Sequence, residues 1–322
     1  MTHDHASHHH HDHGAHGHGA GHGGHAHSHA PATFGRAFAV GIALNTAYVI
    51  AEALYGVLAN SLALVADAGH NFGDVLSLAV AWFASSLARR APTERYTYGL
   101  RGSSILAALS NAVVLLVVTG GIAWAAILKL AHPSPAGGLT MIAVASAGVL
   151  VNGATALMFA SGRKGDINIR AAFAHMASDA MVALGVAVSG VVILLTQWTW
   201  LDPAVSLAIG ALIVWGTWSL MRESLDLALH AVPASVNRAE VLSYLRGLPG
   251  VSEVHDLHIW GMSTTENALT AHLVRPGREL DDSLLRRACV DLRERFSVHH
   301  ATLQIEEGLA EHPCELAPME VV

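Results

Sequence analysis

Residues 61–87 read SLALVADAGHNFGDVLSLAVAWFASSL, an apolar run that nevertheless contains His70 and Asp74. The run exceeds the ~20 apolar residues with which a helix crosses a bilayer. A second run, Ala171 to Thr196, repeats the pattern with His175 and Asp179. Residues at i and i+4 share one face of a helix, about 5–6 Å apart. Two such helices facing each other therefore present two imidazoles and two carboxylates.

This pattern predicts a tetrahedral site for a divalent metal ion. Ionisable side chains inside a membrane span are costly and mark a substrate or ion path. Neutral imidazole and carboxylate suit Zn²⁺, and two carboxylates balance its charge. The alternative is a set of polar contacts between helices, but such contacts need no repeated His-x-x-x-Asp.

The composition of the whole chain favours a membrane protein. The 322 residues are 52% hydrophobic with a mean hydropathy of +0.41. Only 13% are charged, about half the share in soluble domains. Two cysteines near the C-terminus argue against a disulfide framework, and the polar start predicts no cleavable signal peptide.

Six apolar runs predict six transmembrane helices in a domain of residues 34–224. Basic residues cluster in the second and fourth dividers and after the sixth run, which predicts cytoplasmic N- and C-termini in the inner (plasma) membrane. The runs are Arg36 to Leu58, Ser61 to Leu87, Ser103 to Leu130, Leu139 to Ser161, Ala171 to Thr196 and Leu201 to Met221.

Residues 1–33 form a His-rich tail, with thirteen of the 23 histidines between His3 and His29. Because no apolar period accompanies them, we expect disorder. The functional interpretation of this tail is that it binds metal ions weakly and collects them. The alternative is a purification tag or a neutral spacer. A floppy ligand set imposes no geometry, so the transport site is not expected here.

Residues 232–308 have the composition of a soluble domain, followed by a tail of residues 309–322. The order helix, strand, strand, helix, strand predicts a small sheet with helices on one face. Its modest size favours dimerisation. The predicted elements are a helix capped by Asn237, strands Val251 to Trp260 and Ala268 to Val274, a helix Asp282 to Phe296, and a strand Ala301 to Glu306.

A second set of candidate ligands lies on these strands: His255, His272 and Glu306. Strand alternation predicts that His255 and His258 point to opposite faces and do not share an ion. The alternative is ordinary surface polarity. The spacing neither requires nor excludes a ligand role for five further residues: Gln304, His299, His300, His312 and Cys314.

Polar residues also occur in the first two spans, where an unpartnered carboxylate is neutral or paired. Asn45, Glu52 and Asp67 are candidates for a second shell or a proton relay, with helix packing as the alternative, and Asn71 is a candidate for metal selectivity.

Taken in order, the motifs resemble the cation diffusion facilitator family, and within it the bacterial cobalt-zinc-cadmium exporters. The resemblance covers about Arg36 to Glu306. It rests on Asp67-Ala68-Gly69-His70 with Asp74, Arg95-Tyr96-Thr97-Tyr98-Gly99, His175 to Asp179, Leu201-Asp202-Pro203, His255-Asp256-Leu257-His258-Ile259-Trp260 and His300-Ala301-Thr302-Leu303-Gln304-Ile305-Glu306.

The resemblance implies a homodimeric metal/proton antiporter of the zinc, cobalt and cadmium resistance type. It implies six transmembrane helices and a cytoplasmic αββαβ domain of ferredoxin or metallochaperone type. The transport ligands carry over to His70, Asp74, His175 and Asp179, between the second and fifth helices, and His255, His272 and Glu306 match ligand positions of the cytoplasmic domain. The implied partners are a second copy, lipid, divalent metal ions and protons, with no nucleic acid and no required cofactor.

Three departures from the family pattern modify these expectations. Residues 88–102 contain no His, Asp or Cys, so we predict no metal site in that loop. Ser103-Ser104 stands where many relatives have Glu. Gln304 replaces a ligating His of some members, which makes a two-metal cluster in the soluble domain doubtful.

Two other classes of function compete with transport. A membrane metalloenzyme needs an open coordination position and a catalytic acid or base, and no His-Glu-x-x-His motif supplies one. A metal sensor that does not transport would use the His-rich tail and the soluble domain, but it would not need two intramembrane His-x-x-x-Asp phrases.

Overall fold

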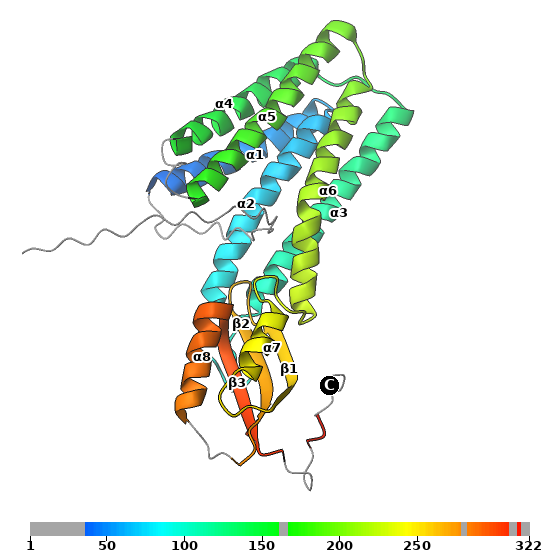
Figure 1. Cartoon of the computed structure of the whole chain (residues 1–322). Helices are drawn as coiled ribbons and strands as arrows, with labels where there is room; N and C mark the ends of the chain where they lie inside the picture. Colours follow the sequence, from blue (N-terminus) through cyan, green and yellow to red (C-terminus); the bar gives the residue numbers. More distant parts are fainter. Residues whose placement is uncertain (1–35, 161–166, 278–281, 309–313, 317–322) are drawn as a thin grey trace, which may run out of the picture.

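The computed structural model describes residues 36–160, 167–277, 282–308 and 314–316. A bundle of long helices stands above a small sheet domain (Figure 1). The predicted fold class, an α-helical membrane protein with a C-terminal α+β domain, is confirmed. The long helices are α1 (Arg36–Leu58), α2 (Leu62–Ala88), α3 (Ser103–Ala131), α4 (Gly138–Ala160), α5 (Ile167–Thr196) and α6 (Leu201–Ala228).

Within the described part of the chain, five helices, α2 to α6, have the length and apolarity to cross a membrane. Their outer surfaces carry many large apolar side chains, among them Trp215 and Leu195, which are 80% and 78% exposed. Apolar exposure on this scale marks a surface that meets another apolar medium, here lipid. The remaining helix, α1, is 23 residues long and packs on α2 and α4.

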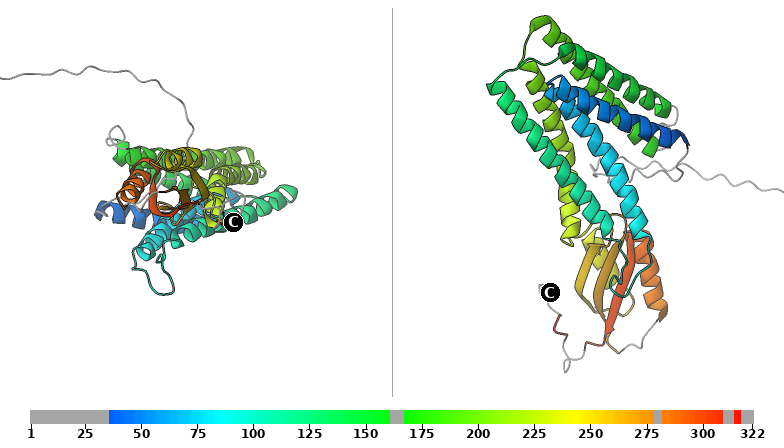
Figure 2. Two further views of the ribbon diagram at one scale, coloured as in Figure 1. Left: turned by 60° about the horizontal axis from the view of Figure 1, so that its bottom comes forward. Right: turned by 180° about the vertical axis from the view of Figure 1, so that it is seen from behind.

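The helices form two groups. α5 packs along α4, with α1 beside α4, whereas α6 packs along α3, with α2 against both. Figure 1 and the rear view in Figure 2 show α2, α3 and α6 continuing toward the sheet domain while α1, α4 and α5 tilt away. α2 also contacts α5, so the His-x-x-x-Asp helices meet where the two groups join.

Two helices extend beyond the predicted apolar runs. α5 starts at Ile167 rather than Ala171, and α6 ends at Ala228 rather than Met221. Most of the residues after Met221, RESLDLA, are good helix formers, and three of the seven are charged. Helical propensity therefore continues where hydrophobicity stops, and the extension brings α6 to the sheet domain.

The sheet domain is an αββαβ unit, as predicted. Its strands run in the order β1-β2-β3, with β1 and β2 antiparallel and β2 and β3 parallel. Helices pack on one face over a core that includes Leu245, Leu269 and Leu292, and the other face is left open. The elements are α7 (Arg238–Arg246), β1 (Glu253–Gly261), β2 (Asn267–Val274), α8 (Asp282–Phe296) and β3 (Val298–Glu306).

One predicted strand pattern is wrong. A bulge interrupts β1 between His255 and His258, where Asp256 has φ +49°. Because of the extra residue, two residues instead of one lie between the core residues Val254 and Leu257. His255, Asp256 and His258 therefore share the open face, rather than His255 and His258 facing opposite ways.

Polar contacts join the two parts of the molecule at the α2–α3 linker. Arg101 forms an ion pair with Glu266 of the β1–β2 loop. Ser104, at the start of α3, accepts a hydrogen bond from the Thr264 backbone N–H at 3.1 Å. Of the Ser103-Ser104 pair, Ser104 thus contributes to this junction, whereas Ser103 Oγ donates to the Ala84 carbonyl of α2.

A second polar cluster closes the end of the bundle away from the sheet domain. The fully buried Asp202 carboxylate accepts hydrogen bonds from Ser61 Oγ (2.6 Å) and from the backbone N–H groups of Leu62 and Ala63. Lys129 Nζ lies 2.9 Å from Asp202 and donates to the Asn60 carbonyl. We call Asn60, Ser61, Lys129 and Asp202 the far-end cluster, which ties α2, α3 and α6 together.

Candidate metal sites

The four side chains of the two His-x-x-x-Asp phrases lie together between α2 and α5. His70 Nε2 is 3.4 Å from Asp179 Oδ1, and His175 Nε2 is 3.3 Å from Asp74 Oδ2. Within each helix the His–Asp separations are 4.0 Å on α2 and 3.7 Å on α5. We call His70, Asp74, His175 and Asp179 the intramembrane cluster.

These separations suit a small divalent ion. Donor atoms about 2.1 Å from a tetrahedral Zn²⁺ are about 3.4 Å apart, close to the observed spacings. Asp179 is almost fully buried, whereas His70, Asp74 and His175 are each partly exposed. Three of the four side chains are thus not sealed inside the bundle core, while one buried carboxylate lies behind them. No arrangement of a nucleophile with a general base is needed to explain this geometry.

A buried polar network adjoins the intramembrane cluster. The fully buried Glu52 accepts hydrogen bonds from Tyr48 Oη at 2.7 Å and from Asn71 Nδ2 at 3.1 Å. Asp67, also fully buried, is a neighbour of Glu52, and neither oxygen of its carboxyl group has a described hydrogen-bond partner. Carboxylate oxygens only accept hydrogen bonds, so two neighbouring buried carboxyl groups can bond to each other only when one of them carries a proton. Asn45, partly buried on α1, has no described hydrogen-bond partner for its Oδ1.

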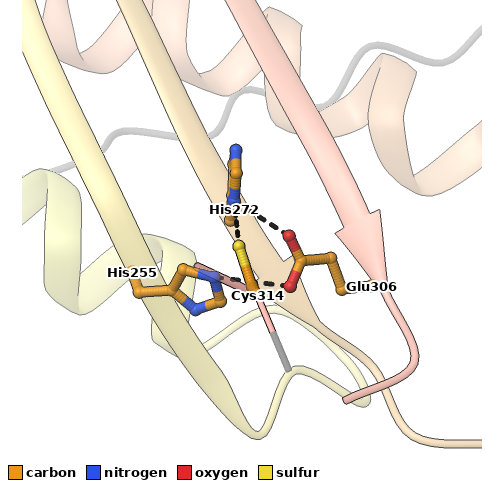
Figure 3. A group of neighbouring side chains, drawn as sticks. All are labelled: His255, His272, Glu306 and Cys314. Atoms are coloured by element: carbon orange, nitrogen blue, oxygen red, sulfur yellow. Dashed lines mark hydrogen bonds and ion pairs between the residues drawn. The ribbon is translucent and has the colours of Figure 1, made fainter. Parts of the chain in front are cut away.

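A second cluster lies on the open face of the sheet (Figure 3). His272 Nδ1 is 2.9 Å from Glu306 Oε1, and His255 Nε2 is 3.4 Å from Glu306 Oε2. Cys314 Sγ approaches His272 Nδ1 to 3.5 Å. One donor atom from each of the four residues lies within 4.8 Å of the others. We call His255, His272, Glu306 and Cys314 the cytoplasmic cluster.

Outer contacts orient these donors. His272 Nε2 lies 3.3 Å from Asp256 Oδ2, so an Nε2–H donated to Asp256 leaves Nδ1 free to bind an ion, as in many metal sites. Gln304 Nε2 donates to Glu306 Oε1 at 2.9 Å. The backbone at Leu316 lowers the pKa of the Cys314 thiol, but partial burial and the Glu306 and Asp256 carboxylates outweigh it, and the net pKa is raised.

The sequence-predicted residues are thus grouped into two places. His255, His272 and Glu306 meet, whereas His258 contacts Asp256 at 2.7 Å and lies beside the cluster. His299 contacts the Asn267 backbone and His300 the Tyr98 ring. The His-rich tail and His312 fall outside the described residues.

Sequence reasoning missed two residues next to these sites, Tyr48 and Asp256, and one in the far-end cluster, Lys129. Tyr48 carried a signal, since it precedes Glu52 by one helical turn on the same face. Asp256 was quoted in a motif, but its position depends on the bulge. Lys129 pairs with Asp202 across 73 residues of sequence, so no local pattern signals the contact.

Two family models match consecutive parts of the chain. Residues 38–227 match the cation efflux transmembrane domain, and residues 233–308 match the cation efflux protein cytoplasmic domain. Together they take in the helical bundle and the sheet domain. The chain belongs to the cation diffusion facilitator family, and it is a metal cation efflux transporter of the cobalt-zinc-cadmium type rather than an enzyme.

Characterised relatives are similar over nearly their whole length. The metal cation efflux system protein CzcD of Cupriavidus metallidurans is 35% identical over 287 residues, 88% of each chain. Zinc transporter ZitB of Escherichia coli is 34% identical over 84% of this chain and 86% of its own. The cadmium, cobalt and zinc/H(+)-K(+) antiporter of Bacillus subtilis is 30% identical over 85% and 89%.

One solved structure is similar to the sheet domain. It is the metal-bound C-terminal domain of the CzcD transporter from Cupriavidus metallidurans, 33% identical, covering 22% of this chain and 99% of that chain with a TM-score of 0.20.

Proposed function

We propose that the protein exports Zn²⁺, and also Co²⁺ or Cd²⁺, in exchange for protons by alternating access around the intramembrane cluster. The single observation that carries this proposal is the meeting of two imidazoles and two carboxylates between α2 and α5, with the four His–Asp donor separations between 3.3 and 4.0 Å. Zinc is placed first because this donor set and spacing suit tetrahedral Zn²⁺. The relatives named for zinc, cobalt and cadmium support the wider range.

Exchange with protons follows from the chemistry of the donors. A metal ion binds deprotonated imidazole and carboxylate, so binding displaces protons and protons displace the metal. Glu52 and Asp67 are proposed as a proton relay beside the site, with Asn45 and Asn71 as outer-shell groups. The neighbouring buried carboxyl groups of Glu52 and Asp67 offer a place for one proton away from the metal donors.

The energetics of export require a coupled ion. Moving two positive charges outward against 100 mV, negative inside, costs about 4.6 kcal/mol, and each returning proton recovers about 2.3 kcal/mol. A pH difference of one unit adds about 1.4 kcal/mol per proton.

The proposed setting is the inner membrane, with α1 as the sixth span and both termini in the cytoplasm. The basic residues of the α2–α3 linker, on the sheet-domain side, support this orientation. We propose a homodimer, supported by the match to the cytoplasmic-domain family model. The cytoplasmic cluster is proposed to bind a regulatory metal ion through His255, His272 and Glu306.

The test is metal uptake into inside-out vesicles, following zinc and lumenal pH together. The parent is expected to take up zinc with matching proton release, and Asp179→Ala is expected to lose both. Ser178→Ala, an exposed change one residue away, is the matched control and should transport normally. Parental uptake by Asp179→Ala would contradict the proposed site.

A metal sensor is the second candidate function, favoured only by the presence of the cytoplasmic cluster. It predicts tight zinc binding that His255→Ala removes, with no zinc flux in parental vesicles. Flux in the parent would exclude a sensor that does not transport.

A further inference from the structure

We propose that Cys314, from the segment after the last strand, is the fourth ligand of the cytoplasmic metal site, so that metal binding fastens this segment to the open face of the sheet. This inference rests on the proposed site formed by His255, His272 and Glu306. It adds a sulfur donor to that site, and it links metal binding to the position of Cys314 on the open face of the sheet.

The first argument is the geometry of the cluster. Cys314 Sγ lies 3.5 Å from His272 Nδ1, and its distance to the other two donors is within 4.8 Å. Tetrahedral Zn²⁺ with bonds of about 2.0–2.3 Å needs donors about 3.4–3.7 Å apart. The four side chains therefore need to close by about 1 Å, which rotations about side-chain bonds supply.

The second argument is an incomplete set of partners at a buried group. His255 is 2% exposed, and among the described residues neither ring nitrogen has a hydrogen-bond partner, although Nε2 points toward Glu306. Burying an unpaired polar group costs free energy. An ion bound to Nε2 would satisfy that nitrogen. Figure 3 shows the imidazoles, the carboxylate and the thiol converging on one point.

The third argument is charge balance. When the metal binds, the Cys314 thiol loses its proton to solvent, and a metal–sulfur bond replaces the S–H bond. One thiolate and one carboxylate then neutralise a divalent ion between two neutral imidazoles. With His255, His272 and Glu306 alone, the site would keep one net positive charge and an open position.

Cobalt spectroscopy tests the sulfur ligand in the full-length chain. Co²⁺ replaces Zn²⁺ in such sites, and a thiolate ligand gives it a near-ultraviolet charge-transfer band. The chain has two cysteines, and neither belongs to the intramembrane cluster or to the His-rich tail. The band therefore reports only on Cys314 or Cys289.

Cys289 supplies a matched control because it lies on α8, the helix over the covered face of the sheet. We expect the band in the parent and in Cys289→Ser, and its loss in Cys314→Ser. Alkylation by a maleimide should be slowed by Zn²⁺ at Cys314 but not at Cys289. A band that survives Cys314→Ser would overturn the inference.

Cobalt stoichiometry separates this inference from the proposal beneath it. If His255→Ala lowers bound cobalt by one ion per chain but the parent has no charge-transfer band, the three-ligand site stands and the Cys314 inference fails. If His255→Ala binds as much cobalt as the parent, both fail. Zinc flux in vesicles measures the transport proposal independently of either result.

Discussion

The far-end cluster predicts a large stability loss when Lys129 is replaced by methionine. Asp202 is fully buried, and Lys129 Nζ, 2.9 Å away, is its cationic partner among the described residues. Removing one member of a buried ion pair costs about 3–5 kcal/mol. Asp202 keeps three hydrogen bonds, from Ser61 Oγ and two backbone N–H groups, so we expect about 3 kcal/mol.

The measurement is the temperature at which detergent-solubilised protein loses its monodisperse peak in size-exclusion chromatography. At about 2–4 °C per kcal/mol, the range for a domain of the size of the helical bundle, Lys129→Met should lower the midpoint by about 6–12 °C. The double variant Lys129→Met, Asp202→Asn should recover much of this loss, because no unpaired charge is buried. Arg246→Met, at an exposed position of α7, serves as the control. A loss below about 1 kcal/mol, or a double variant less stable than Lys129→Met, would refute the reasoning.

Three further predictions concern metal transport and are read in the vesicle assay. His175→Ala should reduce zinc uptake to background while the protein stays folded and inserted, because a ligand is lost without a core contact; uptake at the parental rate would count against the four-ligand site. Deletion of residues 1–30 should change apparent zinc affinity without abolishing transport, and complete inactivity of a well-expressed truncation would contradict the tail's auxiliary role. Glu266→Lys should replace the ion pair with Arg101 by the repulsion of two cations and weaken the apparent zinc affinity of transport. Adding Arg101→Glu should restore the ion pair and the affinity. An unchanged zinc dependence in Glu266→Lys would show that the domain junction is not coupled to the intramembrane cluster.

Local patterns allowed much of this architecture to be predicted. A spacing of four residues inside an apolar run places His70 near Asp74 whatever the rest of the chain does, and the second phrase does the same on α5. The Asn237 cap is confirmed, since its Oδ1 accepts from the N–H groups of Ala239 and Glu240. These features depend on backbone periodicity alone.

Features that depend on distant contacts or irregular backbone were not predictable in this way. Strand alternation assumes a regular pleat, and the bulge at Asp256 breaks it. The Lys129–Asp202 pair and the approach of Cys314 to His272 join residues far apart in sequence, so no local period encodes them. The ligand roles of both clusters remain predictions.

The far-end cluster fixes one end of α2, and the domain junction lies beyond the other end. Leu62 is hydrogen-bonded to Asp202 at one end of α2. The other end, Ala88, lies about 39 Å away at 1.5 Å per residue and leads into the linker whose Arg101 pairs with Glu266 of the sheet domain. Asp74 lies about 18 Å from the anchored end. If α2 rotates as a rigid rod about Leu62, a 2 Å displacement of its Ala88 end moves Asp74 by about 0.9 Å. The α5 ligands would not follow this movement, because α5 packs along α4. A small movement of the sheet domain would thus lengthen donor spacings near 3.4 Å beyond those of a tetrahedral zinc site. The fixed point of this movement is the Lys129–Asp202 ion pair, which touches neither metal site.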